Sequence, residues 1–173
     1  MKTYKTEFKG YLDDLAKKAP TPGGGSAVCV VFCIAVSLME MAIQYSLGKN
    51  KKLKEHLGQL QKLKRKVYPF IDLDGKLFNQ IMKSKDSSRQ KLLKKSEELI
   101  VELGRACLGL LSLAKKAESG IKKSIISDFY IGLGLGKVVL AGCIFNLEAN
   151  SRMFGSKNKY IKIFKKSLKS WPK

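Results

Sequence analysis

The sequence predicts an all-α, single-domain helical bundle of about five to six helices, on three observations. Between Pro22 and Pro172 the only proline is Pro69, so little interrupts long helices. Apolar residues recur at spacings of three and four, and the alternation that marks a strand is nowhere sustained. The chain has 173 residues, 45% of them hydrophobic and 28% charged, which is enough for one domain with its own core. We therefore expect a single domain over residues 1–173.

The first two predicted helices are separated by a run of helix breakers. An amphipathic stretch over about 3–18 ends at residues 19–25, which read Ala-Pro-Thr-Pro-Gly-Gly-Gly. Ser26 is the expected N-cap of a buried helix that ends near Ser46. Glu40 is either a site residue or the point where this helix reaches solvent, and the second is expected.

The remaining helices follow from apolar periodicity. A stripe of leucines predicts a helix from Leu53, and Pro69 should kink this helix or divide it. Further helices are expected over about 70–81, 89–116, 124–150 and 158–169. The helix over 124–150, with Ser127 as its cap, is apolar all round in its middle and should lie at the centre of the fold. Three of its residues should let neighbouring helices approach closely: Gly132, Gly134 and Gly136.

The chain carries a large positive charge of unusual composition. Lys and Arg number 34 against 14 Asp and Glu, for a net charge of +20. Such a charge attracts nucleic acid, an anionic membrane or a polyanionic small molecule. Only four cations are arginines, the residue that base and bidentate phosphate recognition favour. We expect a lysine-rich, solubilising surface, and nucleic-acid binding stays an alternative.

Cysteine usage and hydropathy favour a cytoplasmic protein without a metal site. The four cysteines sit among apolar residues, show no C-x-x-C pair and have only His56 as an imidazole companion. Free thiols in a reducing cytoplasm are expected. The apolar stretch 27–43 rises about 26 Å as a helix, short of the ~30 Å hydrocarbon core, and Glu40 interrupts it. It is predicted to be a core helix, with no membrane partner.

Asp74 is the first catalytic candidate. On a helix it shares the core-facing stripe of Phe70, Leu77 and Ile81, and burial raises the pKa of a carboxyl toward the range useful for acid and base catalysis. Asp72 points to the other side, so the two are not a facing pair. The alternative for Asp74 is a structural hydrogen bond or a lysine partner.

Three further sequence features bear on binding. Gly23-Gly24-Gly25-Ser26 can expose backbone N–H groups at a helix N-terminus, where an anion or polarised oxygen binds; the alternative is a flexible connector. Ser127-Asp128 suits a helix start. Two amides one turn apart on an apolar face need partners, and a ligand ring is one candidate: Asn146 and Asn150.

These motifs together resemble one protein family. The run Pro20 to Ser26, the stretch Asp72-Leu73-Asp74, Ser127-Asp128 and the stretch Phe145 to Asn150 occur in its order and approximate spacing. The chain is similar to the cyclodeaminase and cyclohydrolase family, which includes the C-terminal domain of formimidoyltransferase-cyclodeaminase and bacterial methenyltetrahydrofolate cyclohydrolase. The resemblance spans roughly 5–155. One departure is the bulky stretch Val28 to Cys33, where the family has an alanine-rich helix, so the pocket is expected to be narrower.

The resemblance implies an all-α homodimer acting on a one-carbon derivative of tetrahydrofolate, with no metal or cofactor. Such enzymes close formimino-tetrahydrofolate with loss of ammonia, or open methenyl-tetrahydrofolate with water. The family's acidic position falls at Asp72 to Asp74, and periodicity selects Asp74. Substrate binding is then assigned to these residues: Pro22, Gly23, Gly24, Gly25, Ser26, Ser127, Asp128, Asn146 and Asn150. The alternative function is a non-catalytic basic helical binder, either a degenerate family member or a nucleic-acid protein.

Overall fold

The computed structural model of the chain describes residues 4–171, which form seven α-helices, two short 3₁₀ turns and no strand. The helices are α1 Tyr4–Leu15, α2 Gly24–Ser46, α3 Lys51–Val67, α4 Phe70–Lys83, α5 Asp86–Ala117, α6 Ile126–Phe154 and α7 Tyr160–Lys169. The 3₁₀ turns are Glu118–Gly120 and Lys123–Ile125. The predicted all-α fold is confirmed. Thr3, where the first predicted helix was expected to begin, lies outside the described residues.

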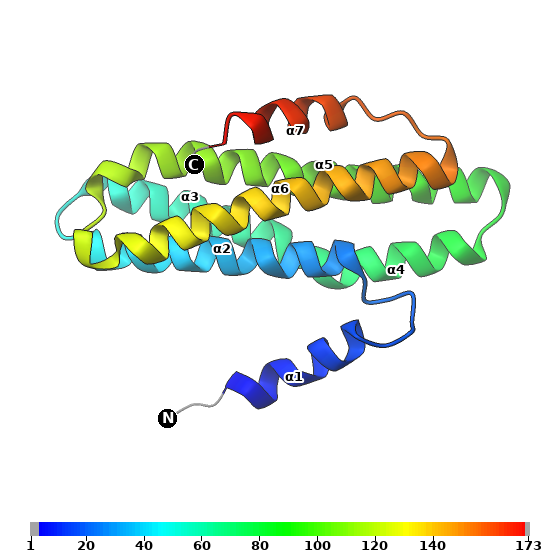
Figure 1. Cartoon of the computed structure of the whole chain (residues 1–173), viewed down its shortest axis with the longest axis horizontal. Helices are drawn as coiled ribbons and strands as arrows, with labels where there is room; N and C mark the ends of the chain where they lie inside the picture. Colours follow the sequence, from blue (N-terminus) through cyan, green and yellow to red (C-terminus); the bar gives the residue numbers. More distant parts are fainter. Residues whose placement is uncertain (1–3, 172–173) are drawn as a thin grey trace.

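Six of these helices, α2 to α7, form one elongated bundle, and α1 stands apart from it (Figure 1). The largest contact between helices joins α2 to α6. The long helix α5 packs on α6, α4 and α3, and α7 lies over α6 near the C-terminal end. Pro69 divides two helices as predicted, since α3 ends at Val67 and α4 begins at Phe70.

Glycines bring α2 and α6 into close antiparallel contact. A Cβ on Gly132 would lie 2.8 Å from the Ala35 carbonyl oxygen, and one on Gly142 would lie 2.5 Å from a Val28 methyl. Gly136 likewise faces Leu110 and Trp171 at 3.1 Å. Gly134 differs from the prediction, because nothing lies within 4 Å of its Cβ position. The pairing places the start of α2 beside the end of α6.

The core comprises apolar side chains from α2, α3, α5, α6 and α7, including Phe32, Phe129 and Phe164 at 0% exposure. The prediction that α6 lies at the centre of the fold is wrong for one face. Ile131, Val138 and Phe145 are 55%, 58% and 66% exposed. Because α6 packs against α2, α5 and α7 on its other sides, this outer face has no neighbour within the described chain.

Two predicted helix caps are corrected by the structure. Helix α2 begins at Gly24, with Gly23 as N-cap, so Ser26 lies inside its first turn. Helix α6 begins at Ile126, directly after a 3₁₀ turn, so Ser127 is also inside the helix and makes no cap hydrogen bond. In both cases the chain enters the helix earlier than the serine.

Glu40 does not mark the point where α2 reaches solvent. It is 6% exposed, and its Oε2 accepts a hydrogen bond of 2.5 Å from the Lys64 ammonium on α3. The ion pair with Lys64 offsets the cost of burying the Glu40 carboxylate. The sequence of α2 alone does not show this partner, because Lys64 belongs to α3.

All four cysteines are free, as predicted. Cys33 is partly exposed and the other three are buried.

Two segments are long and apolar enough to cross a membrane: α2 and Lys123–Phe154. In the bundle, 56% and 44% of their most apolar windows are buried. Core helices meet the same criterion.

Candidate active site

The glycine run and Asp74 meet at the start of α2. A Cβ on Gly25 would lie 2.3 Å from Asp74 Oδ1 and 2.5 Å from both Cγ and Oδ2. The carboxyl group of α4 therefore occupies the space that any side chain at position 25 would fill. Glycine is required here because of this close approach, with ordinary backbone angles.

Asp74 caps α2 from a neighbouring helix. Its carboxylate accepts a hydrogen bond from the backbone N–H of Ser26, one of the first-turn donors that has no partner within α2. The Asp74 carboxylate therefore has the N-capping role that was expected of the Ser26 hydroxyl. A capping group from another helix explains why α2 can begin at Gly24 without a side-chain cap of its own.

The environment of Asp74 favours its protonated form. Burial raises the pKa of its carboxyl above the ordinary value, and the hydrogen bond from Ser26 acts in the opposite direction. Cys29, one turn further along α2, is fully buried, and the pKa of its thiol is raised by burial and then by the charge of Asp74. A half-buried carboxyl whose pKa is raised is better suited than an ordinary one to act as a proton donor as well as a proton acceptor.

The loop before α2 is fixed to α4 and α1. Thr21 packs against Gly75, whose Cβ position lies 3.2 Å from Thr21 Cβ, and the Asn79 amide donates a hydrogen bond of 3.2 Å to Thr21 Oγ1. From α1, the Tyr11 hydroxyl and Ser26 Oγ are 3.0 Å apart. These contacts on both sides of the glycine run argue against a flexible connector. Pro22, next to them, is partly buried and follows a cis peptide bond.

Asn146 reaches the same place from α6. Its side-chain oxygen lies 3.9 Å from the Cβ position of Gly24, so an amide, a carboxyl and the first turn of α2 converge. Asn150 lies one turn further along α6 and is partly buried. The structure therefore brings together the predicted residues of three separate sequence segments: 23–26, 74 and 146.

Three predicted residues lie elsewhere. Asp72 is exposed on the other side of α4, as the periodicity indicated. Ser127 and Asp128 lie at the opposite end of the bundle, because α6 runs antiparallel to α2. Asp128 is separated from Asn146 by 18 residues of helix, about 27 Å. Within one chain, Ser127 and Asp128 therefore cannot contact a ligand held at Gly25.

Sequence reasoning missed four residues of this site: Tyr11, Thr21, Cys29 and Asn79. Thr21 lies within the conspicuous glycine and proline run, so its position was a usable signal. Tyr11 and Asn79 belong to amphipathic helices in which an exposed polar side chain is ordinary. Their roles depend on how α1 and α4 pack, and no local pattern reveals that.

The described residues hold no group of three or more His, Cys, Asp or Glu side chains placed to share a metal ion. The site as it stands offers a carboxyl of raised pKa, helix N-terminal amides and a side-chain amide. Such a set suits proton transfer on a ligand whose polar edge is held by neutral donors and acceptors.

The chain is similar in sequence and in fold to known proteins. The sequence model of a family described as formiminotransferase-cyclodeaminase matches residues 7–169. The chain is 26% identical over 161 residues to a methenyltetrahydrofolate cyclohydrolase of Methylorubrum extorquens, covering 82% of this chain and 77% of that protein. It resembles the crystal structure of formiminotetrahydrofolate cyclodeaminase from Thermotoga maritima with a TM-score of 0.79 and 22% identity, over 94% of this chain and 84% of that one. At this identity the structural similarity shows a shared helical fold.

Proposed function

The chain belongs to the formiminotransferase-cyclodeaminase family, and we propose that it is an enzyme that acts on a one-carbon derivative of tetrahydrofolate with Asp74 as its acid and base. The observation that carries the proposal is the half-buried Asp74 carboxyl, packed on Gly25 at the start of α2, with Asn146 beside the neighbouring Gly24. The names of the two relatives each specify a one-carbon derivative of tetrahydrofolate, the methenyl form for one and the formimino form for the other.

The first candidate reaction is hydrolysis of methenyl-tetrahydrofolate, supported by the similarity to a cyclohydrolase. Asp74 in its carboxylate form takes a proton from water as the water oxygen bonds to the methenyl carbon. The tetrahedral adduct then breaks one carbon–nitrogen bond, and Asp74 returns the proton to the departing nitrogen. The product is a formyl-tetrahydrofolate, and one proton is released overall. A positioned acid–base group contributes about 10²- to 10⁴-fold to such a step.

The second candidate is cyclodeamination, supported by the family description and the shared fold. Here the anilinic nitrogen attacks the formimino carbon, and its proton passes to the imino nitrogen, which becomes an amine. Asp74 in its protonated form gives its proton to that amine, the carbon–nitrogen bond breaks, and ammonia leaves as the methenyl-tetrahydrofolate cation forms. The raised pKa of Asp74 suits this role, because a larger fraction stays protonated near neutral pH.

Substrate orientation falls to the groups around Asp74. Because the Ser26 N–H binds Asp74, we propose that the backbone N–H groups of Gly23 to Gly25 bind a ring oxygen, and that Asn146 offers both a donor and an acceptor to the edge of a pteridine. Asn150, one turn along, is proposed to extend that edge. Both reactions need only proton transfer and addition to carbon, so we propose no metal or cofactor.

We further propose that the enzyme is a homodimer that pairs through α6. Ile131, Val138 and Phe145 recur every seven residues and form one exposed apolar stripe. Two copies of α6 that pack antiparallel about Val138 bury this stripe symmetrically. In that register residue 127 of one copy lies opposite residue 149 of the other. Ser127 and Asp128 of the partner subunit then lie near Asn146 and Asn150.

A spectrophotometric assay of methenyl-tetrahydrofolate tests the proposed function. The purified chain should accelerate its decay in water, or its formation from formimino-tetrahydrofolate with release of ammonia. Acceleration of neither reaction at saturating substrate would contradict the proposal. The rival reading is a basic nucleic-acid binder, favoured only by the net charge of +20. It requires duplex affinity that falls with salt at a log–log slope of about −0.9 for each phosphate contacted.

A further inference from the structure

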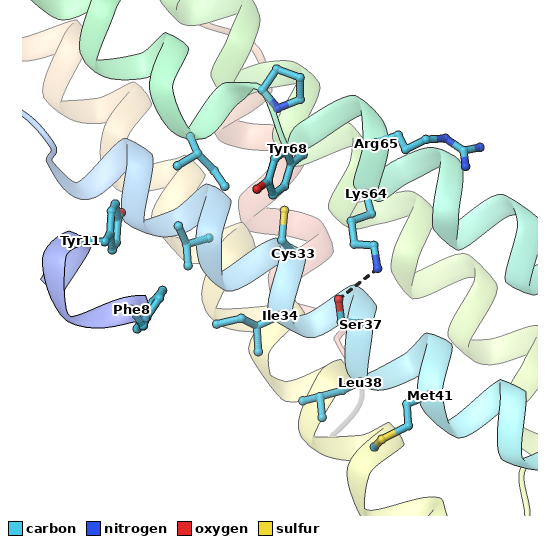
Figure 2. Close-up of a pocket in the computed structure, with 13 residues that line it drawn as sticks. Phe8, Tyr11, Cys33, Ile34, Ser37, Leu38, Met41, Lys64, Arg65 and Tyr68 are labelled. Atoms are coloured by element: carbon cyan, nitrogen blue, oxygen red, sulfur yellow. Dashed lines mark hydrogen bonds between the residues drawn. The ribbon is translucent and has the colours of Figure 1, made fainter. Parts of the chain in front are cut away.

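A groove of about 870 Å³ lies between α1, α2 and the corner where α3 meets α4 (Figure 2). Its volume is in the range of small-molecule sites, about 300–1,000 Å³. Val30 and Cys33 lie in its wall, so the bulky side chains near the start of α2 leave it open. Of the residues described at the candidate active site, Tyr11 alone lines this groove.

One end of the groove adjoins the candidate active site. Tyr11, which lines it, is hydrogen-bonded to Ser26, and the Ser26 backbone N–H binds Asp74. Ile71, also in the wall, precedes Asp74 by one turn of α4. The groove therefore begins beside the chain of hydrogen bonds that runs from Tyr11 through Ser26 to Asp74.

The middle of the groove is apolar and aromatic. Figure 2 shows Phe8 and Tyr11 of α1 on one side and Tyr68 beside Cys33 on the other. The rings of Phe8 and Tyr11 are 5.7 Å apart, with an angle of 35° between their planes. Aromatic side chains on opposite walls suit a flat aryl ring, because offset or edge contacts between rings are favourable.

Polar and cationic groups lie on the side of the groove formed by α3. Lys64 donates hydrogen bonds to Ser37 (3.2 Å) and to the buried Glu40 (2.5 Å), so its charge is neutralised locally. The next residue, Arg65, lies at the exposed rim, with its guanidinium directed away from Ser37 in Figure 2, and no ion pair with it is found in the described part of the chain. From Val30 to Met41 the groove follows α2 for about 17 Å, and Leu38 and Met41 make its far end apolar.

We propose that this groove binds the p-aminobenzoylglutamate arm of the folate substrate. The inference rests on the proposed function, which places the one-carbon unit at Asp74. The aryl ring lies between Tyr68 and the rings of α1, and the glutamate carboxylates pair with Arg65 at the rim, whose exposed side chain turns toward them on binding. Aromatic walls that begin beside the Asp74 site, followed by a cation at the rim, match the order of groups in the ligand. A purely apolar occupant, such as a helix of a second copy, would leave Arg65 unmatched.

Binding of free p-aminobenzoylglutamate tests the groove without any catalysis. Titration calorimetry is applied to the wild type, Tyr68→Ala and Tyr45→Ala. The two tyrosines are equally exposed, at 66% and 67%, but Tyr45 does not line the groove. Tyr68→Ala should weaken binding about tenfold, and Tyr45→Ala should leave it unchanged. Equal binding by all three proteins would overturn the proposal.

Steady-state kinetics supply a second measurement. Arg65→Ala should raise KM for the folate several-fold with little change in kcat, because an arm remote from the reacting carbon contributes equally to ground-state and transition-state binding. Lys54→Ala removes one exposed charge from the same helix outside the groove and is the matched control. Arg65→Lys should restore part of the affinity. An unchanged KM for Arg65→Ala and Tyr68→Ala would contradict the assignment.

Cys33 reports occupancy of the groove directly. It lines the groove and is the one cysteine of four that is not fully buried, so a thiol reagent should label it selectively. Burial raises the pKa of its thiol to about 11, so labelling rates are compared at one fixed pH. At ten times its Kd, p-aminobenzoylglutamate should slow labelling about tenfold. Labelling that is unaffected by the bound fragment would place the arm elsewhere.

The two proposals fail in different ways. If the folate reaction proceeds but Tyr68, Arg65 and Cys33 respond to neither fragment nor substrate, the groove assignment is wrong and the function stands. If neither folate reaction is accelerated while the fragment still binds in a Tyr68-dependent manner, the catalytic function is wrong and the groove stands. A change in oligomeric state of Tyr68→Ala would instead identify a second copy as the occupant.

Discussion

At the scale of single residues, the site depends on the fit of one carboxyl group over one glycine. Asp74 lies where a Cβ of Gly25 would be, and it accepts the hydrogen bond of the Ser26 N–H. The same contact holds the carboxyl in a half-buried place, where burial raises its pKa. Structural capping and proton transfer are therefore two properties of one arrangement.

The Gly25→Ala variant tests this fit. Its methyl group would displace the Asp74 carboxyl, the movable end of a side chain, so the fold should persist while turnover falls on the order of 10²-fold or more. Gly58→Ala is the control, because nothing lies within 4 Å of that Cβ position. Folding is checked by circular dichroism and turnover with the folate substrate. Normal turnover in Gly25→Ala would show that the carboxyl position is not critical.

Asp74→Asn should stabilise the protein near neutral pH. The pKa of Asp74 is raised in the folded state, so stability falls as pH rises from the unfolded value of about 4 through the folded value. Asparagine does not ionise, so this fall in stability is absent, and its side-chain oxygen can still accept the hydrogen bond from the Ser26 N–H. We expect Asp74→Asn to unfold at a higher urea concentration than the wild type near neutral pH, and the difference to disappear below pH about 4. Equal stability of the two proteins at both pH values would contradict the raised pKa.

At the scale of helices, α2 and α6 position the site. Their antiparallel contact sets the start of α2, with the glycine run, beside Asn146 near the end of α6. The contact depends on small residues, since the Gly132 Cβ position is 2.8 Å from a backbone oxygen that cannot turn aside.

Gly132→Ala should therefore separate α2 from α6. The expected cost is about 1–3 kcal/mol in the free energy of unfolding, since the backbones must move apart. Gly109→Ala is the control, because its Cβ would make an ordinary contact of 3.5 Å with Leu63. Urea titration of both variants measures the difference. Equal stability of Gly132→Ala and Gly109→Ala would show that the contact between α2 and α6 can accommodate an extra methyl group.

Helix existence was largely predictable from the sequence, and helix starts were not. The spacing of apolar residues and the single Pro69 are local signals, and they located the helices of the bundle. The capping of α2 is supplied by Asp74, nearly fifty residues away, so the sequence pointed to Ser26 instead. Glu40 was misjudged for the same reason, because its partner Lys64 is on another helix.

At the scale of the whole molecule, one face of the chain is apolar while its charge is strongly positive. The stripe of Ile131, Val138 and Phe145 is exposed, whereas 34 cations give the chain a net charge of +20. Periodicity marked α6 as apolar all round, but it could not distinguish burial within one chain from burial between two. Ser127 and Asp128 are far from Asp74 within one chain, which agrees with burial of the stripe between two chains in the proposed dimer.

Val138→Lys should disrupt the proposed dimer. A charge at the centre of the stripe would be buried against its own copy, which costs several kcal/mol. Light scattering after gel filtration should give twice 19.3 kDa for the wild type and 19.3 kDa for the variant. Because residue 138 is 58% exposed in the single chain, folding should be preserved. A wild-type monomer would contradict the proposed interface.

Catalysis at this site requires that Asp74 moves the proton in a one-carbon folate reaction. The most direct measurement compares kcat of the wild type, Asp74→Asn and Asp72→Asn on the folate substrate. Asp72 lies two residues away on the same helix and is exposed, so it controls for charge and helix. Asp74→Asn should lose about 10²- to 10⁴-fold in kcat, and Asp72→Asn should retain nearly all of it. A folded Asp74→Asn protein with wild-type turnover would contradict the central claim.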